Sequence, residues 1–167
     1  MRTILQPSLL ILAMIAAACT DPVKDHAIDR LGQEKSGIPE GPEHRPGQPC
    51  VLCHSEGGTA SGKKFAIAGT IYDTKAAARG AENVKVVFVD SAGSERQAFT
   101  NAAGNFFIRE SEWPDLTFPF KTGVARGNLT TNMSTTVNRE GSCNFCHVPG
   151  GDPRESIDPI FAPGGAP

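Results

Sequence analysis

The stretch NVKVVFVD, residues 83–90, decides the fold class. Side chains alternate between the two faces of an extended chain, so Val84, Val86 and Phe88 share one face. The other face carries a lysine followed by two valines. Because both faces become apolar toward the end, the pattern predicts a strand that is buried on both sides.

Similar alternation surrounds this strand, separated by the turn signals DSAG and NAAGN. The further predicted strands are residues 64–73, 96–100, 105–110 and 116–123. Several short strands at this spacing predict a small antiparallel β-sandwich over residues 65–126. The chain is therefore expected to be mainly β, with the sandwich flanked by irregular segments that contain short helical turns.

The stretches GTIYD, RGAENVKVVFVDSAG and TNAAGNFFI resemble the carboxypeptidase regulatory-like domain, a transthyretin-like sandwich. The matching positions are Gly69, Asp73, Asp90, Gly93, Thr100, Gly104 and Phe106. Asn101 stands where that family commonly has aspartate. The resemblance covers the middle of the chain and implies a scaffold or interaction module without chemistry of its own.

The N-terminus reads as a secretory signal over residues 1–18, because Arg2 is followed by the apolar run LLILAMIAAA. Small residues directly before Cys19 resemble a bacterial lipobox, which implies a lipidated Cys19 and a membrane anchor. The alternative is plain cleavage that leaves Cys19 as a spare thiol. Thr20, in place of the aspartate of inner-membrane retention, favours the outer membrane, facing either the periplasm or the cell surface.

Residues 19–46 are charged and interrupted by prolines, which predicts a flexible, extended tether behind the anchor. The formal net charge is -2 and the isoelectric point is near 6.1. Without a basic stripe, nucleic acid is not expected as a partner.

The pentapeptide CVLCH (50–54) returns as CNFCH (143–147), and together they hold every cysteine after Cys19. C-x-x-C-H is the attachment signature of c-type haem. Two thiols three positions apart on one turn lie on the same side and can bond one porphyrin edge, while the histidine becomes the proximal ligand. The predicted haem-binding segments are residues 47–64 and 127–167, the second ending in a Pro/Gly-rich tail. The predicted residues are Cys50, Cys53 and His54 for one haem, and Cys143, Cys146 and His147 for the other.

Three other uses of these cysteines remain open: a Cys₄ zinc site, a redox C-x-x-C motif, and two local disulfides. Neither the zinc site nor the disulfides explain why a histidine follows the second cysteine both times. A redox motif would be expected at the start of a helix in a βαβ unit, which the sequence does not show.

The sixth iron ligands must come from the histidines and the methionine that remain once the leader is removed. His44 lies just before the first pentapeptide and is the leading candidate, against a solvated loop histidine. Met133 lies in a polar stretch without the apolar periodicity of a core residue. His26 lies near the anchor, where a solvated histidine is favoured over a ligand.

The two pentapeptides resemble those of dihaem and multihaem c-type cytochromes of bacterial envelopes. That resemblance implies two c-type haems, electron exchange with other redox proteins of the envelope, and no enzymatic activity. One alternative is a peroxidase-like haem enzyme or sensor with an open sixth coordination site. Another is a β-sandwich scaffold lipoprotein without haem.

Overall fold

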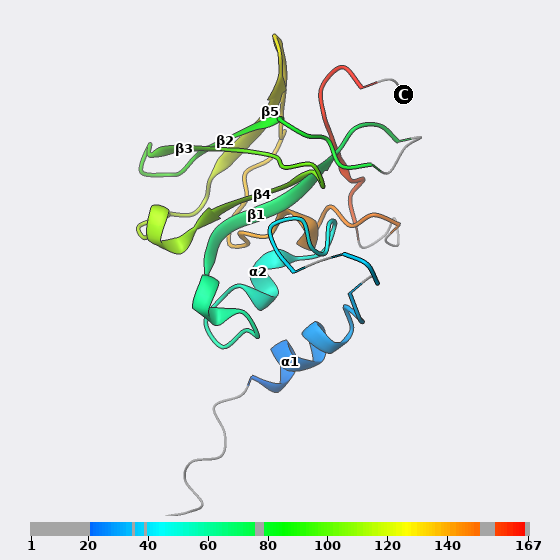
Figure 1. Cartoon of the computed structure of the whole chain (residues 1–167). Helices are drawn as coiled ribbons and strands as arrows, with labels where there is room; N and C mark the ends of the chain where they lie inside the picture. Colours follow the sequence, from blue (N-terminus) through cyan, green and yellow to red (C-terminus); the bar gives the residue numbers. More distant parts are fainter. Residues whose placement is uncertain (1–20, 35, 39, 76–78, 151–155, 166–167) are drawn as a thin grey trace, which may run out of the picture.

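The computed structural model describes residues 21–34, 36–38, 40–75, 79–150 and 156–165. The predicted signal peptide and Cys19 lie outside these ranges. Figure 1 shows the layers of strands above the short helices labelled α1 and α2. The helices are α1 (Pro22–Asp29) and α2 (Cys50–Cys53), and the 3₁₀ turns are η3 (Ser61–Lys63), η4 (Glu110–Glu112) and η5 (Cys143–Phe145). The strands are β1 (Phe65–Tyr72), β2 (Lys85–Val89), β3 (Glu95–Phe99), β4 (Asn105–Arg109), β5 (Lys121–Arg126), β6 (Leu129–Asn132) and β7 (Ile160–Phe161).

The strands form a three-stranded sheet in the order β4-β1-β7 and a four-stranded sheet in the order β3-β2-β5-β6. All pairs are antiparallel except β1 with β7, which is parallel. The chain is therefore mainly β, and the prediction of a small sandwich is confirmed.

The core lies between the two sheets. On β2, Val86 and Phe88 are at most 2% exposed, and Val84 just before the strand is fully buried, as the alternation predicted. Ile67 and Ile71 from β1 face them within the same cluster. Burying each such side chain stabilises the fold by about 1.5–3 kcal/mol. The opposite face of β2 is half-buried rather than fully covered.

Three parts of the strand prediction need correction. The strand expected at residues 116–123 begins only at Lys121, because Pro119 has no N–H to donate to a sheet. β6 was not predicted, since LTTN is an exposed edge strand without apolar alternation. β7 was not predicted because it lies inside the Pro/Gly-rich tail. Both additions extend the sandwich beyond the expected boundary at residue 126.

The extended tether expected over residues 19–46 is also corrected. Residues 22–29 form α1, whose N-cap Asp21 accepts hydrogen bonds from the N–H groups of Val23 and Lys24. The Lys24 ammonium donates to Ser55 Oγ at 2.7 Å, so α1 docks beside the first pentapeptide. Within the described residues, no helix has the length and apolar character needed to cross a membrane.

Candidate functional site

The first pentapeptide forms a single helical turn beside β1, the central strand of the three-stranded sheet. α2 spans Cys50–Cys53, and the His54 N–H donates to the Cys50 carbonyl at 3.0 Å. The turn packs against β1, as Figure 1 shows. The backbone therefore has the short helical form on which two thiols three positions apart share one side.

The imidazole of His54 is oriented by its neighbours. Its Nδ1 lies 2.8 Å from the Lys63 carbonyl oxygen, a hydrogen bond that places the proton on Nδ1. Nε2 is then the lone-pair nitrogen, as in metal-binding histidines. The ring stacks on Phe65 with centroids 4.1 Å apart, and Phe65 stacks on Phe107 at 4.6 Å. Burial lowers the pKa of His54 and so favours the neutral form that binds metals.

The second pentapeptide repeats this arrangement. The His147 N–H donates to the Cys143 carbonyl at 3.0 Å, and His147 Nδ1 lies 2.7 Å from the Asp158 carbonyl oxygen. Nε2 of His147 is again the lone-pair nitrogen. In two segments that lie far apart in sequence, the histidine Nδ1 is thus hydrogen-bonded to a backbone carbonyl. The C-x-x-C-H spacing alone did not require this.

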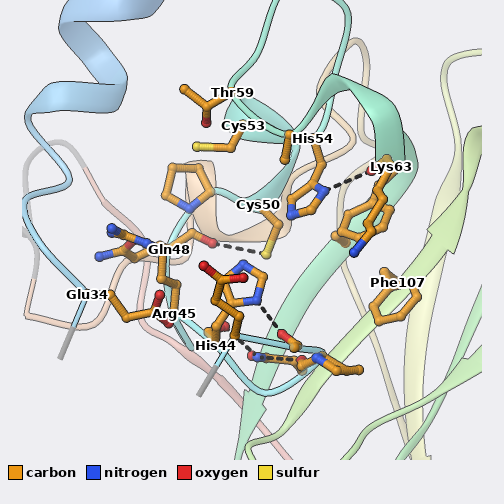
Figure 2. A pocket seen from close by; sticks show the side chains of 18 of the residues that line it. Glu34, His44, Arg45, Gln48, Cys50, Cys53, His54, Thr59, Lys63 and Phe107 are labelled. Carbon is orange, nitrogen blue, oxygen red and sulfur yellow. Dashed lines mark hydrogen bonds between the residues drawn. The ribbon is translucent and has the colours of Figure 1, made fainter. Parts of the chain in front are cut away.

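A cavity of about 560 Å³ adjoins the first pentapeptide, a size typical of ligand sites. Its walls include Cys50, Cys53 and His54, with His44 on another wall. Figure 2 shows both imidazoles lining it, with the Cys50 sulfur beside them. The ring centroids of His44 and His54 are 5.8 Å apart.

The donor set of this cavity suits a haem. The Nδ1 of His44 contacts the Gly41 carbonyl, so His44 also presents Nε2 as its lone-pair nitrogen. Three basic side chains, Arg45, Lys63 and Arg109, line the cavity together with Glu34 and Glu40. The basic side chains can pair with anionic groups of a bound cofactor.

The loop that carries His44 is fixed by two buried polar residues of the sheet. Asn105 Nδ2 donates to the carbonyls of His44 and Pro42 at 3.0 and 3.2 Å. Thr70 Oγ accepts the Gly47 N–H at 2.8 Å. The sequence did not single out either residue. The available signal was a polar residue inside a strand that was predicted to contribute to the core, because such a residue needs a hydrogen-bond partner.

The thiols argue against a redox C-x-x-C motif. Burial raises the pKa of Cys50 to about 11 and that of Cys143 to about 12. The reactive cysteine of a redox motif instead has a lowered pKa. All four described cysteines are free in the structure. Among the described residues, no three His, Cys, Asp or Glu side chains are grouped as a metal site.

Both pentapeptides pack against β1. Ala68 lines the first cavity, and its N–H donates to the Gly141 carbonyl beside the second pentapeptide at 2.9 Å. A Cβ placed on Gly69 would lie 2.8 Å from the Cβ of Cys143. A Cβ on Gly47 would lie 2.9 Å from Pro149 Cγ, which follows the second pentapeptide. The structure therefore brings the two pentapeptides together across one strand.

Of the candidate sixth ligands, the structure brings only His44 into this cavity. Met133 lies directly after β6, where its N–H donates to the Thr122 carbonyl in the four-stranded sheet. His26 is exposed on α1.

No family model, no curated protein and no solved structure matches the chain.

Proposed function

We propose that the chain is a c-type cytochrome that carries two covalent haems and transfers electrons at the bacterial cell envelope. The observation that carries the proposal is the repeated presentation of histidine. In both pentapeptides the backbone N–H of the histidine donates to the carbonyl of the first cysteine. The ring Nδ1 of the histidine is hydrogen-bonded to another backbone carbonyl. Hydrogen bonds of this kind orient imidazole ligands toward metals.

The residues that would hold the haems are those of the two pentapeptides. Cys50, Cys53, Cys143 and Cys146 would form the covalent bonds, and His54 and His147 would be the proximal ligands. A bound haem would supply reversible one-electron chemistry at its iron. The chain contributes orientation through the carbonyls of Lys63 and Asp158. It also contributes an aromatic wall, since Phe65 stacks on His54 and keeps water from that face of the ring.

The arrangement of both pentapeptides on β1 favours electron transfer over a purely structural role. Haems attached at these turns would share β1 as a common wall. The sandwich then serves as a rigid scaffold, in line with the resemblance to the carboxypeptidase regulatory-like domain. The partners we propose are other redox proteins of the envelope, with a lipid on Cys19 retaining the protein at the outer membrane.

A pyridine haemochrome assay on protein made with a c-type maturation system tests the proposal. Wild type is compared with Cys50→Ala/Cys53→Ala, Cys143→Ala/Cys146→Ala and the matched control Val23→Ala, at an exposed position of α1. We expect two covalent haems in wild type and control and one in each double variant. Circular dichroism checks that each variant is folded. A folded, colourless wild type would instead identify a scaffold lipoprotein without haem.

Electron transfer itself is tested by a potentiometric titration of the loaded wild type. Reversible oxidation and reduction of both haems is expected. A protein whose haems are reduced only irreversibly would contradict an electron-transfer role.

A further inference from the structure

The mature chain has few side chains of the kind that complete haem coordination. After the leader it contains four histidines and Met133, and the structure describes all of them. Two of the histidines belong to the pentapeptides. The positions of the other three side chains therefore decide which residue could be the sixth ligand of each haem iron.

His44 is committed to the first site. It lines the same cavity as His54, with ring centroids 5.8 Å apart. The Asn105 side chain donates a hydrogen bond to the backbone carbonyl of His44. The loop is fixed further at Gly47, so moving His44 to the other pentapeptide would break this buried network.

The other two candidates lie elsewhere. Met133 follows β6, and β6 pairs with β5 at the edge of the four-stranded sheet, whereas the second pentapeptide packs against β1 of the other sheet. His26 lies on α1, which packs against α2 and hence on the side of the first pentapeptide.

Several described residues at the second pentapeptide are exposed. Cys146 is exposed, Phe145 is 60% exposed and Ile157, whose N–H donates to the Cys146 carbonyl, is 53% exposed. The first site instead has a cavity that is lined by the loop of His44 and by residues of β1 and β4. The two sites thus differ in one described respect: a second histidine, His44, lines the first, whereas Met133 and His26 lie elsewhere.

We propose that the two haem sites have different coordination: His44 and His54 complete the first, while the second leaves its sixth position to an external small ligand of the carbon monoxide, nitric oxide or cyanide type. This inference rests on the proposed function, because it requires both haems to be attached. It makes the second site a ligand-binding site within an electron-transfer protein, since an open position permits binding that a bis-histidine site excludes.

Carbon monoxide titration of the reduced, full-length, haem-loaded protein tests this inference. Difference absorption spectra should give one carbon monoxide per two haems in wild type. Cys143→Ala/Cys146→Ala should bind none, and His44→Ala should bind two. The matched controls Met133→Ala and His26→Ala should remain at one. Electron paramagnetic resonance of oxidised wild type, which needs no substitution, should show one low-spin and one high-spin haem.

Several results would overturn the inference. Wild type that binds no carbon monoxide, with two low-spin signals, would mean that the second site has a protein ligand; gain of binding in Met133→Ala or His26→Ala would identify it. Binding at both haems of wild type would remove His44 as a ligand. Binding that disappears at high protein concentration would indicate a ligand from a second copy. Absence of covalent haem, seen before any gas is added, would instead contradict the proposed function.

Discussion

The Nδ2 of Asn105, at the start of β4, donates a hydrogen bond to the backbone carbonyl of His44 at 3.0 Å. The same nitrogen donates to Pro42, and the Oδ1 of Asn105 accepts the Thr70 hydroxyl at 2.8 Å. Thr70 in turn accepts the Gly47 N–H. Every polar atom of the Asn105 side chain is therefore paired, and the two strands clamp both ends of the loop that carries His44.

Replacing Asn105 with aspartate should release this loop. Asn105→Asp keeps an acceptor for Thr70 but loses both donated hydrogen bonds, worth about 1 kcal/mol each. It also turns a carboxylate oxygen toward two carbonyls. We expect the free energy of unfolding to fall by about 2–3 kcal/mol in urea titrations. In the haem-loaded protein, a high-spin fraction should appear at the first site.

The exposed Asn138 provides the matched control. Asn138→Asp introduces the same charge and should change stability by less than about 0.5 kcal/mol. Equal stabilities of the two variants would show that the Asn105 hydrogen bonds do not hold the loop.

Gly47 and Gly32 form a second matched pair. Both have positive φ, +81° and +70°, so alanine at either position pays a backbone cost of about 1 kcal/mol. A Cβ on Gly47 would also lie 2.4 Å from the Tyr72 hydroxyl, whereas nothing lies within 4 Å of one on Gly32. Gly47→Ala should therefore be less stable than Gly32→Ala by about 1–3 kcal/mol in urea unfolding. Equal losses would mean that the contact with Tyr72 relaxes without cost.

The fold could be predicted where the apolar alternation of a segment matches its place in the core. β1 and β2 carry apolar alternation because both contribute to the core, and their positions were close to those expected. α1 carried a local start signal, Asp21 followed by Pro22, but its docking through Lys24 on a distant turn leaves no sequence pattern. β7 is two residues long and owes its form to pairing with β1.

The candidate site was predictable only for the pentapeptides, whose chemistry lies in five adjacent residues. The cavity depends on contacts between distant segments, such as the pairing that places Phe107 beside Phe65. His44 was singled out by elimination, and its position opposite His54 depends on Asn105, sixty-one residues away. Such contacts leave no local periodicity from which they could be inferred.

Gly69 fixes the distance between β1 and the second pentapeptide. A Cβ there would lie 2.8 Å from both the Cys143 Cβ and the Phe106 ring, so Gly69→Ala must displace one of them. We expect a loss of about 1–3 kcal/mol of stability. Covalent haem at the second site should fall, which is measured by haemochrome assay in the Cys50→Ala/Cys53→Ala background. Haem at the first site should persist, which is measured in the Cys143→Ala/Cys146→Ala background.

Gly62 is the control for that experiment, because a Cβ there meets nothing within 4 Å. Gly62→Ala should retain haem at the second site. A Gly69→Ala protein with unchanged haem content would show that the pentapeptide shifts without losing its attachment geometry.

Asp73, directly after β1, connects the two sheets, and its ion pairs make the stability of the fold depend on pH. Its carboxylate pairs with Arg126 at the end of β5 and with Arg79 at 2.9 Å, and its side chain is 19% exposed. The hydrogen bond from Arg126 holds the pKa of Asp73 below its usual range. The hydrogen bond from Arg79 lowers the pKa further, by a smaller amount. The folded state therefore binds a proton less readily than the unfolded state, so the pair stabilises the fold above the unfolded pKa, about 3.9.

This stabilisation is lost as the pH falls through the lower pKa of the folded state. Asp73→Asn should cost about 1 kcal/mol at pH 7, near the upper end for partly exposed pairs. The difference between wild type and variant should shrink toward zero below about pH 4, measured by urea unfolding across pH. Glu56→Gln, which removes a more exposed partner of Lys64, serves as the control and should have a smaller effect. A wild-type advantage that stays constant down to pH 2 would mean that the contribution of Asp73 does not depend on its charge.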